Sequence, residues 1–204
     1  MANKNRTGFY PVGTLTGAPW SASLRRFPAN TTVCNVCKGD LVELTVDGTV
    51  EPVVGASSNI LGVVVGIEPI TRTTTSVQAS SLTLERTYIP KSTSGMFVRV
   101  TTDPFVLLQT VTANGTTIGT ANVGEQYNVL GTAGGRQTPT TTPLGTGTLD
   151  VGNPQVNAVG QLVLMDIGFD IANDASNSTY AGSNTTALVM ISSSVFKAAK
   201  ATKG

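Results

Sequence analysis

Nearly a third of this chain is β-branched, since 64 of its 204 residues are Thr, Val or Ile. These side chains are stiff at χ1 and fit a pleated sheet better than a helix. The 22 Gly and 10 Pro supply frequent turns between short strands. We therefore expect an all-β fold, a small β-barrel or sandwich with long Thr/Gly-rich loops, an extended N-terminal arm and little helix.

The clearest local pattern is a β-hairpin near residue 47. Apolar and polar residues alternate from Val42 to Val46, as a half-buried strand requires. Asp47-Gly48 then supplies the residue pair of a type I′ hairpin turn. The return strand follows over 49–54, where Pro52 restricts it to an edge or a bulge.

The apolar run from Ile60 to Ile67 predicts a central strand, because both of its faces are apolar. Gly62 and Gly66 within it mark bends or close approaches of another backbone. Shorter patterns predict the remaining strands, over 83–89, 96–101, 105–111, 160–169 and 187–192. A strand-like run also covers 31–38.

The chain divides into an arm, one domain and a tail. Residues 1–30 show neither a helical nor a strand period and contain four of the eleven aromatic residues, which predicts an extended arm that gains order by docking on a partner. Residues 31–196 suit a single domain with a long polar loop at about 131–152. The basic residues 197–204 form a short tail.

The composition argues against catalysis and against several classes of partner. Charged residues make up only 12% of the chain, and histidine, the commonest general acid–base and metal ligand, is absent. A net charge of +1 argues against duplex nucleic-acid binding. The longest apolar run is too short to span a bilayer, and the N-terminus lacks the apolar core of a secretory signal. We expect no enzyme, no cofactor, no membrane or nucleic-acid partner, and synthesis in the cytoplasm.

Two constellations remain as candidates for chemistry. Cys34 and Cys37 have the spacing of half a zinc knuckle, but the chain has no further Cys or His. Three interpretations of this pair stay open: two partly buried thiols, a metal ion shared between chains, or a redox-active disulfide. The spacing of Asp166 and Asp170 places both on one face near the end of a predicted strand. They are either a cation site or two solvated carboxylates. The glycine-rich stretch 131–136 lacks the helix that a phosphate cradle needs.

Three segments in order resemble the head-decoration, or cement, proteins of tailed phages. They are Gly39-Asp40-Leu41-Val42, the turn segment from Asp47 to Pro52, and Leu61-Gly62-Val63-Val64-Val65. The later stretch resembles larger members of the family in Val98 to Pro104, Val123-Gly124-Glu125, Gly147 to Asp150 and Gln161 to Leu164.

The resemblance implies a non-enzymatic virion protein, commonly a homotrimer, that clamps neighbouring major capsid subunits on the surface of the phage head. The N-terminal arm of such proteins typically contacts the shell. On this basis Phe9, Tyr10 and Trp20 are predicted as apolar anchors, and Arg25 and Arg26 as partners of acidic shell residues. The alternative is a carbohydrate-binding or host-adhesion component of a head fibre or tail, for which the Thr/Gly-rich loops would serve.

Overall fold

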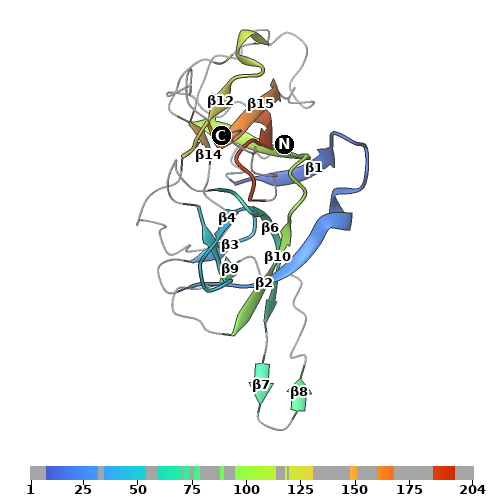
Figure 1. Cartoon of the computed structure of the whole chain (residues 1–204), viewed down its shortest axis with the longest axis vertical. Coiled ribbons are helices and arrows are strands. Elements are labelled where there is room, and N and C mark those ends of the chain that lie inside the picture. Colours follow the sequence, from blue (N-terminus) through green and yellow to red (C-terminus); the bar gives the residue numbers. More distant parts are fainter. Residues whose placement is uncertain are drawn as a thin grey trace, which may run out of the picture.

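The computed structural model describes residues 8–31, 35–53, 59–69, 71–73, 76–78, 88–89, 95–113, 118, 120–130, 148–150, 160–167 and 186–195. The fold is all-β, as the sequence predicts, and the described residues form two main, mostly antiparallel sheets (Figure 1). The helical content of the described residues is two short 3-10 turns, η1 (Trp20–Ser23) and η2 (Thr120–Asn122).

A seven-stranded sheet occupies one end of the molecule, at the top of Figure 1. Its central strand β11 (Val106–Ala113) pairs with strands from both ends of the chain. The other members are β1 (Tyr10–Thr14), β12 (Gln126–Tyr127), β13 (Val129–Leu130), β14 (Thr148–Asp150), β15 (Leu162–Ile167) and β16 (Thr186–Ile191). The pairing of β11 with β14 is parallel, and the remaining ladders of this sheet are antiparallel.

A five-stranded antiparallel sheet lies next to it, with the strand order β2-β10-β6-β4-β5. Its strands are β2 (Leu24–Pro28), β4 (Leu41–Leu44), β5 (Val50–Pro52), β6 (Gly62–Pro69) and β10 (Met96–Thr101). The two ends of this sheet meet at one bridge between Ala29 and Val50, where the Asn30 N–H also donates to the Val50 carbonyl at 2.8 Å. The sheet is therefore strongly curled, although no ladder among the described residues closes it into a barrel.

Two small two-stranded sheets complete the fold. β3 (Val36–Cys37) pairs with β9 (Tyr88–Ile89), and Val36 and Ile89 join the core of the five-stranded sheet. β7 (Thr71–Thr73) pairs with β8 (Ser76–Gln78) to form a ribbon, here called the projecting ribbon, which stands away from the body in Figure 1. Within the described residues, the main contacts of its two strands are with each other.

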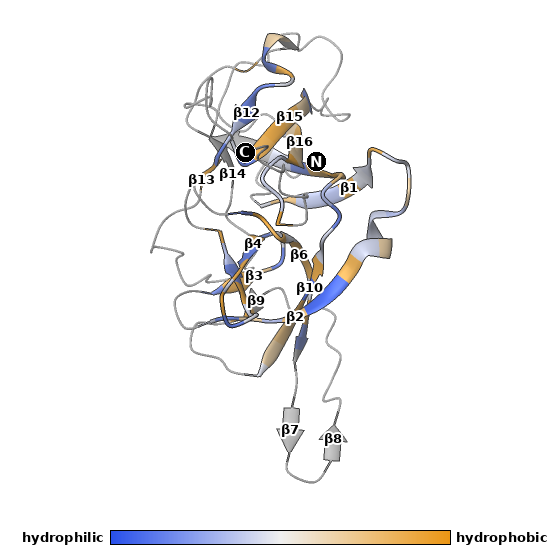
Figure 2. Ribbon diagram, viewed as in Figure 1, coloured by the Kyte–Doolittle hydropathy of each residue, from blue (hydrophilic) through white to orange (hydrophobic). Residues whose placement is uncertain are grey.

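Two hydrophobic cores share the strands of the five-stranded sheet. One core lies between the two sheets and contains Leu41 and Val63 together with Leu108, Leu164 and Val189 of the seven-stranded sheet. The other fills the inside of the curled sheet and contains Val42, Val64, Val98 and Val100. Figure 2 shows the apolar colouring along β15 and the contrasting polar segment of β2.

β6 is the central strand that the apolar run predicts. It lies between β4 and β10 and sends Val63 into one core and Val64 into the other. Gly62 is the close approach expected there, because a Cβ on this residue would lie 1.8 Å from the Thr101 carbonyl oxygen. A Cβ on Gly66 would meet only the Arg99 side chain, at ordinary distances of 3.7 Å from Cβ and 3.9 Å from Cδ.

The hairpin of β4 and β5 is confirmed, with Pro52 on an edge strand, but its turn differs from the prediction. The Gly48 N–H donates to the Thr45 carbonyl at 3.1 Å, and the Thr45 N–H donates to the Thr49 carbonyl at 2.9 Å. This is a three-residue loop in which Gly48 has a positive φ of 74°, rather than a two-residue type I′ turn. Asp-Gly suits both turns, so the dipeptide alone did not decide between them.

The N-terminal segment does not form a separate arm over residues 8–31. β1 pairs with β11 and β2 pairs with β10, so this segment belongs to both sheets. The register of β1 shifts between Pro11 and Gly13, which interrupts the alternation that a sequence pattern needs. Residues 1–7 and the predicted tail 197–204 lie outside the described residues.

The predicted loop at 131–152 contains a strand, because Thr148–Asp150 forms β14. The rest of that loop, including 131–136, lies outside the described residues, as do 83–87 of the predicted strand 83–89. The strand predictions over 96–101, 105–111, 160–169 and 187–192 correspond to β10, β11, β15 and β16.

Candidate contact surface

Phe9, the first predicted anchor, serves the protein's own fold. Its side chain is 0% exposed and packs in the core between the two sheets. Its N–H donates to the Gly39 carbonyl at 2.8 Å, which ties the start of the chain to the turn before β4. The prediction that Phe9 contacts a neighbouring protein is therefore wrong.

Tyr10 and Trp20 are half-buried against the same body. Tyr10 lies in β1 opposite Gln109, and the Trp20 side chain packs on the core between the sheets. The Trp20 carbonyl accepts hydrogen bonds from Ser23 Oγ at 3.0 Å and Thr101 Oγ1 at 3.4 Å. Both aromatic residues thus hold the N-terminal segment on the two sheets, and a contact with another protein stays a prediction for them.

Arg26 is already engaged within the chain. Its Nε lies 3.0 Å from Glu68 Oε2, and its guanidinium lies 3.9 Å from the centre of the Phe97 ring. Arg99, opposite Arg26 in the ladder of β2 and β10, binds the other oxygen of the same Glu68 carboxylate. Two guanidiniums therefore share one carboxylate, and the cluster carries one net positive charge on the outside of the sheet.

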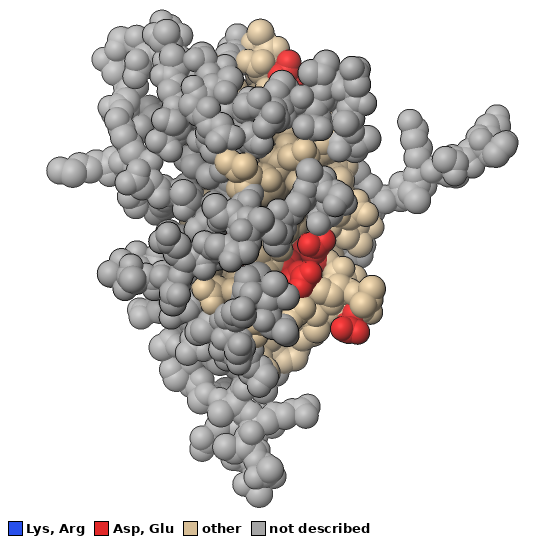
Figure 3. Space-filling model, turned by 90° about the vertical axis from the view of Figure 1, so that its left-hand side faces the viewer, with Lys and Arg blue, Asp and Glu red and all other residues tan. Residues whose placement is uncertain are grey.

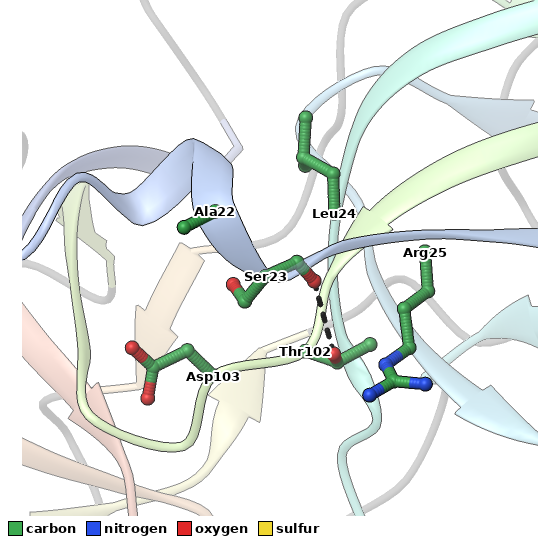
Figure 4. Close-up of a pocket in the computed structure, with 6 residues that line it drawn as sticks. All are labelled: Ala22, Ser23, Leu24, Arg25, Thr102 and Asp103. Carbon is green, nitrogen blue, oxygen red and sulfur yellow. Dashed lines mark hydrogen bonds between the residues drawn. The ribbon is translucent and has the colours of Figure 1, made fainter.

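Arg25 lines a surface cavity of about 580 Å³ at the junction of η1, β2 and the loop after β10 (Figure 4). The other lining residues are Ala22, Ser23, Leu24, Thr102 and Asp103. The cavity wall is fixed by backbone contacts, since Thr102 donates from its N–H and from Oγ1 to the Ser23 carbonyl, at 3.3 Å and 3.1 Å. Arg25 and Asp103 lie on opposite sides of this pair. Among the described residues, no carboxylate forms an ion pair with Arg25.

Two exposed apolar side chains, Leu15 and Phe105, belong to residues that hydrogen bonds link to the cavity wall. Asp103 Oδ1 accepts the Phe105 N–H at 2.8 Å, and the Phe105 carbonyl accepts the Leu15 N–H at 3.1 Å. These bonds connect Asp103 in the cavity wall to Phe105, and Phe105 to Leu15. Phe105 is 47% exposed and Leu15 is 50% exposed. We call the cavity together with Leu15 and Phe105 the shoulder surface.

The hairpin of β4 and β5 presents a second exposed surface, here called the hairpin tip, formed by Leu44, Val46 and Asp47. Val46 is fully exposed, with a relative accessibility of 103%, and Leu44 is 42% exposed. Behind the tip, Glu43 and Glu51 lie directly opposite each other across the two strands.

On the face of the molecule drawn in Figure 3, the charged side chains of described residues that can be seen are acidic, and no described Lys or Arg is visible.

A polar cluster of Asn122, Glu125 and Tyr127 lies at the edge of the seven-stranded sheet. Tyr127 Oη donates to Glu125 Oε2 at 2.6 Å, and Asn122 Nδ2 donates to the same oxygen at 3.0 Å. These two hydrogen bonds, the one from Tyr127 foremost, hold the pKa of Glu125 below its ordinary value. Burial and the adjacent carboxylate raise the pKa of Tyr127. The cluster fixes the turn before β12.

Only one member of each candidate pair for chemistry lies within the described residues. Cys37 is buried in β3, where its N–H donates to Asp40 Oδ2 at 2.7 Å, and Cys34 lies outside the described residues. Asp166 is exposed and accepts the Ile167 N–H at 2.8 Å, and Asp170 also lies outside the described part. The described residues hold no group of three or more Cys, Asp or Glu arranged to bind a metal ion.

No helix in the described ranges has the length and apolar character needed to cross a membrane.

Sequence reasoning missed the shoulder surface and the hairpin tip. The alternation of Val42, Leu44 and Val46 predicts one buried face, but β4 ends at Leu44 and the loop turns Val46 into solvent. The sequence indicates Arg25 by its charge and does not predict its cavity, because Thr102 and Asp103 reach the cavity only through the pairing of β2 with β10. In comparisons with protein-family models and with curated proteins, none matched this chain.

Proposed function

We propose that the chain is a virion protein that decorates the outside of a mature phage head and cements neighbouring major capsid subunits. It acts as a homotrimer, without enzymatic activity or cofactor. Its partners are the major capsid protein and further copies of itself, and neither nucleic acid nor a membrane takes part. It is made in the host cytoplasm and resides on the capsid surface.

The segments that carry the resemblance support this proposal by their place in the fold. Asp40 accepts the Cys37 N–H and fixes the turn that starts β4, and the segment from Asp47 to Pro52 supplies the loop and β5. The segment 61–65 then enters β6, the strand that both cores share. The quoted motifs therefore specify the central framework of the five-stranded sheet.

The projecting ribbon is the observation that carries the proposal. A two-stranded hairpin is marginally stable in water unless it packs on something else. The ribbon of β7 and β8 stands away from the body in Figure 1, and its main contacts among the described residues are internal. We infer that the adjacent capsid subunit supplies the missing packing surface and that the ribbon is the arm that grips the shell.

Such a contact stabilises the head by mass action. A ligand that binds only the mature shell stabilises it by about 2.7 kcal/mol per site at a concentration one hundred times Kd. Linked contacts within a trimer raise the avidity by about 10²–10⁴ over a single contact. Weak individual ribbons are therefore sufficient.

The test is to replace residues 71–78 by a short Gly-Ser linker and to measure binding of the purified protein to mature heads of the phage that encodes it. We expect an unchanged melting temperature and a roughly tenfold or greater loss of affinity for the heads. Unexpanded heads serve as the control and should bind neither protein. Wild-type affinity of the variant, or glycan-array binding by a protein that ignores the heads, would contradict the proposal.

A further inference from the structure

The outer face of the five-stranded sheet carries a charged cluster built from three neighbouring strands. Arg99 of β10 points outward, because Val98 and Val100 on either side of it are fully buried. Arg26 lies opposite Arg99 in the ladder with β2, and Glu68 belongs to β6 on the other side of β10. Figure 2 shows the hydrophilic segment of β2 that contributes to this face.

The two guanidiniums of the cluster are held side by side. Arg26 Nε lies 3.0 Å from Glu68 Oε2, and Arg99 Nε binds the other oxygen of that carboxylate. The Phe97 ring centre lies 3.9 Å from the Arg26 guanidinium carbon. Gly66, opposite Arg99 in the ladder with β6, leaves the Arg99 side chain free to lie over that strand. Contacts on both sides therefore orient the pair.

The cluster has more positive charge and more hydrogen-bond donors than Glu68 can satisfy. Each guanidinium has five N–H donors, and within the described residues only the Nε groups of Arg26 and Arg99 have a hydrogen-bond or ion-pair partner. Both side chains are about half exposed, at 48% and 56%. Like charges directly opposite each other on neighbouring strands are destabilising. A second anion bound between the two guanidiniums would offset this repulsion.

The number of donors favours a phosphate monoester over a carboxylate as this anion. A carboxylate has two oxygens, which the fork of a single guanidinium can bind. A phosphate monoester has three acceptor oxygens and a charge of about −1.5 to −2 at pH 7, so it can accept N–H groups from two guanidiniums at once. Side chains that are already oriented also lose less conformational entropy on binding.

We propose that Arg26 and Arg99 form a binding site for the phosphate group of a phosphate monoester. The Nη groups of both residues donate to its oxygens, while Glu68 and Phe97 hold the guanidiniums in position. This site is independent of the proposed function, since it needs neither a capsid nor a second copy of the chain. A phosphodiester, with one free oxygen fewer and a single charge, is a weaker ligand for it.

The test is an NMR titration of the purified full-length protein with inorganic phosphate at pH 7.5 and constant ionic strength, observing the Nε–H resonances of Arg26 and Arg99. We expect saturable shifts of both resonances. Acetate and dimethyl phosphate, titrated in the same way, should bind at least about fivefold more weakly. Shifts that do not saturate, or acetate binding as tightly as phosphate, would overturn the assignment.

Substitutions separate this site from a response to net charge. Arg26→Gln and Arg99→Gln should each weaken phosphate binding about tenfold or more. Arg26→Lys should stay at least about fivefold weaker than the wild type, because it keeps the charge without the fork.

Arg25→Gln is the matched control, since it makes the same charge change on the adjacent residue of β2, whose side chain lines the cavity instead. It should bind phosphate within about twofold of the wild type. Equal losses in Arg25→Gln and Arg26→Gln, or wild-type affinity in Arg26→Lys, would contradict the proposal. All variants should keep the wild-type melting temperature, because exposed ion pairs contribute little to stability. No phage heads are present, so a negative result here leaves the ribbon test unaffected.

Discussion

At the scale of single residues, the tightest steric constraint in the described chain is Gly62. A methyl group there would overlap the Thr101 carbonyl oxygen, which is backbone and cannot turn aside. We predict that Gly62→Ala lowers the free energy of unfolding by roughly 3 kcal/mol, because the pairing of β6 with β10 must shift to admit the extra carbon. The measurement is urea denaturation followed by circular dichroism.

Gly13 provides the matched control for this substitution. It also lies in a strand, no atom lies within 4 Å of the position its Cβ would take, and its φ is not positive. Gly13→Ala should change the free energy of unfolding by at most about 0.5 kcal/mol. Equal losses in the two variants would show that glycine content, rather than the contact with Thr101, limits stability.

The hydrogen bond from Tyr127 to Glu125 gives a pH-dependent prediction. The pKa of Glu125 is lowered in the folded protein, so this carboxylate stabilises the fold above its unfolded pKa, and the contribution is lost as pH falls through the folded pKa. Tyr127→Phe should raise the pKa of Glu125 toward its ordinary value. The stability difference between wild type and variant should therefore be larger at pH 7 than at pH 3.

Urea denaturation at the two pH values measures this difference, and an NMR titration of Glu125 gives its pKa directly. Asn122→Ala should produce a smaller rise in the pKa of Glu125, because the bond from Tyr127 is the larger cause of its lowering. A stability difference that is the same at both pH values would argue that Tyr127 acts through packing alone.

At the scale of elements, the N-terminal segment is part of the fold. Phe9→Ala should cost about 3–5 kcal/mol, as expected for a buried aromatic side chain. Val12→Ala, at a position that is 51% exposed on the same segment, should be close to neutral. The two melting curves would coincide only if the segment detaches from the body in solution. Deletion of residues 2–28 removes both β1 and β2 and therefore tests folding, not capsid contact.

The sequence predicts elements whose periodicity is uninterrupted and misses those whose pairing is irregular. The central strand β6 and the strands β10, β15 and β16 follow from their apolar patterns. β1 does not, because Pro11 and the shift before Gly13 break its alternation and its partner β11 lies far along the chain. The candidate contact surfaces are harder still, since Leu15 and Phe105 meet only through that long-range pairing.

At the scale of the whole molecule, the two sheets are joined into one unit by the core between them and by both ends of the described chain. Leu41 and Val63 face the core between the sheets, while their neighbours Val42 and Val64 face the core of the curled sheet. The Ile60 N–H donates to the Ser193 carbonyl at 2.8 Å, and its carbonyl accepts the Val195 N–H at 3.0 Å. These connections favour the single domain that the chain length predicts, although it also includes residues 8–30, which were expected to form a separate arm.

The place of β11 between β1 and β16 also sets a limit on when the protein can fold. Residues 24–101 contain every strand of the five-stranded sheet, so that part can assemble while translation continues. The seven-stranded sheet is complete only after residue 191 has left the ribosome. Until then, the backbone N–H and C=O groups on the side of β11 that pairs with β16 lack that partner. During synthesis the nascent chain therefore exposes an incomplete sheet edge until β16 is complete.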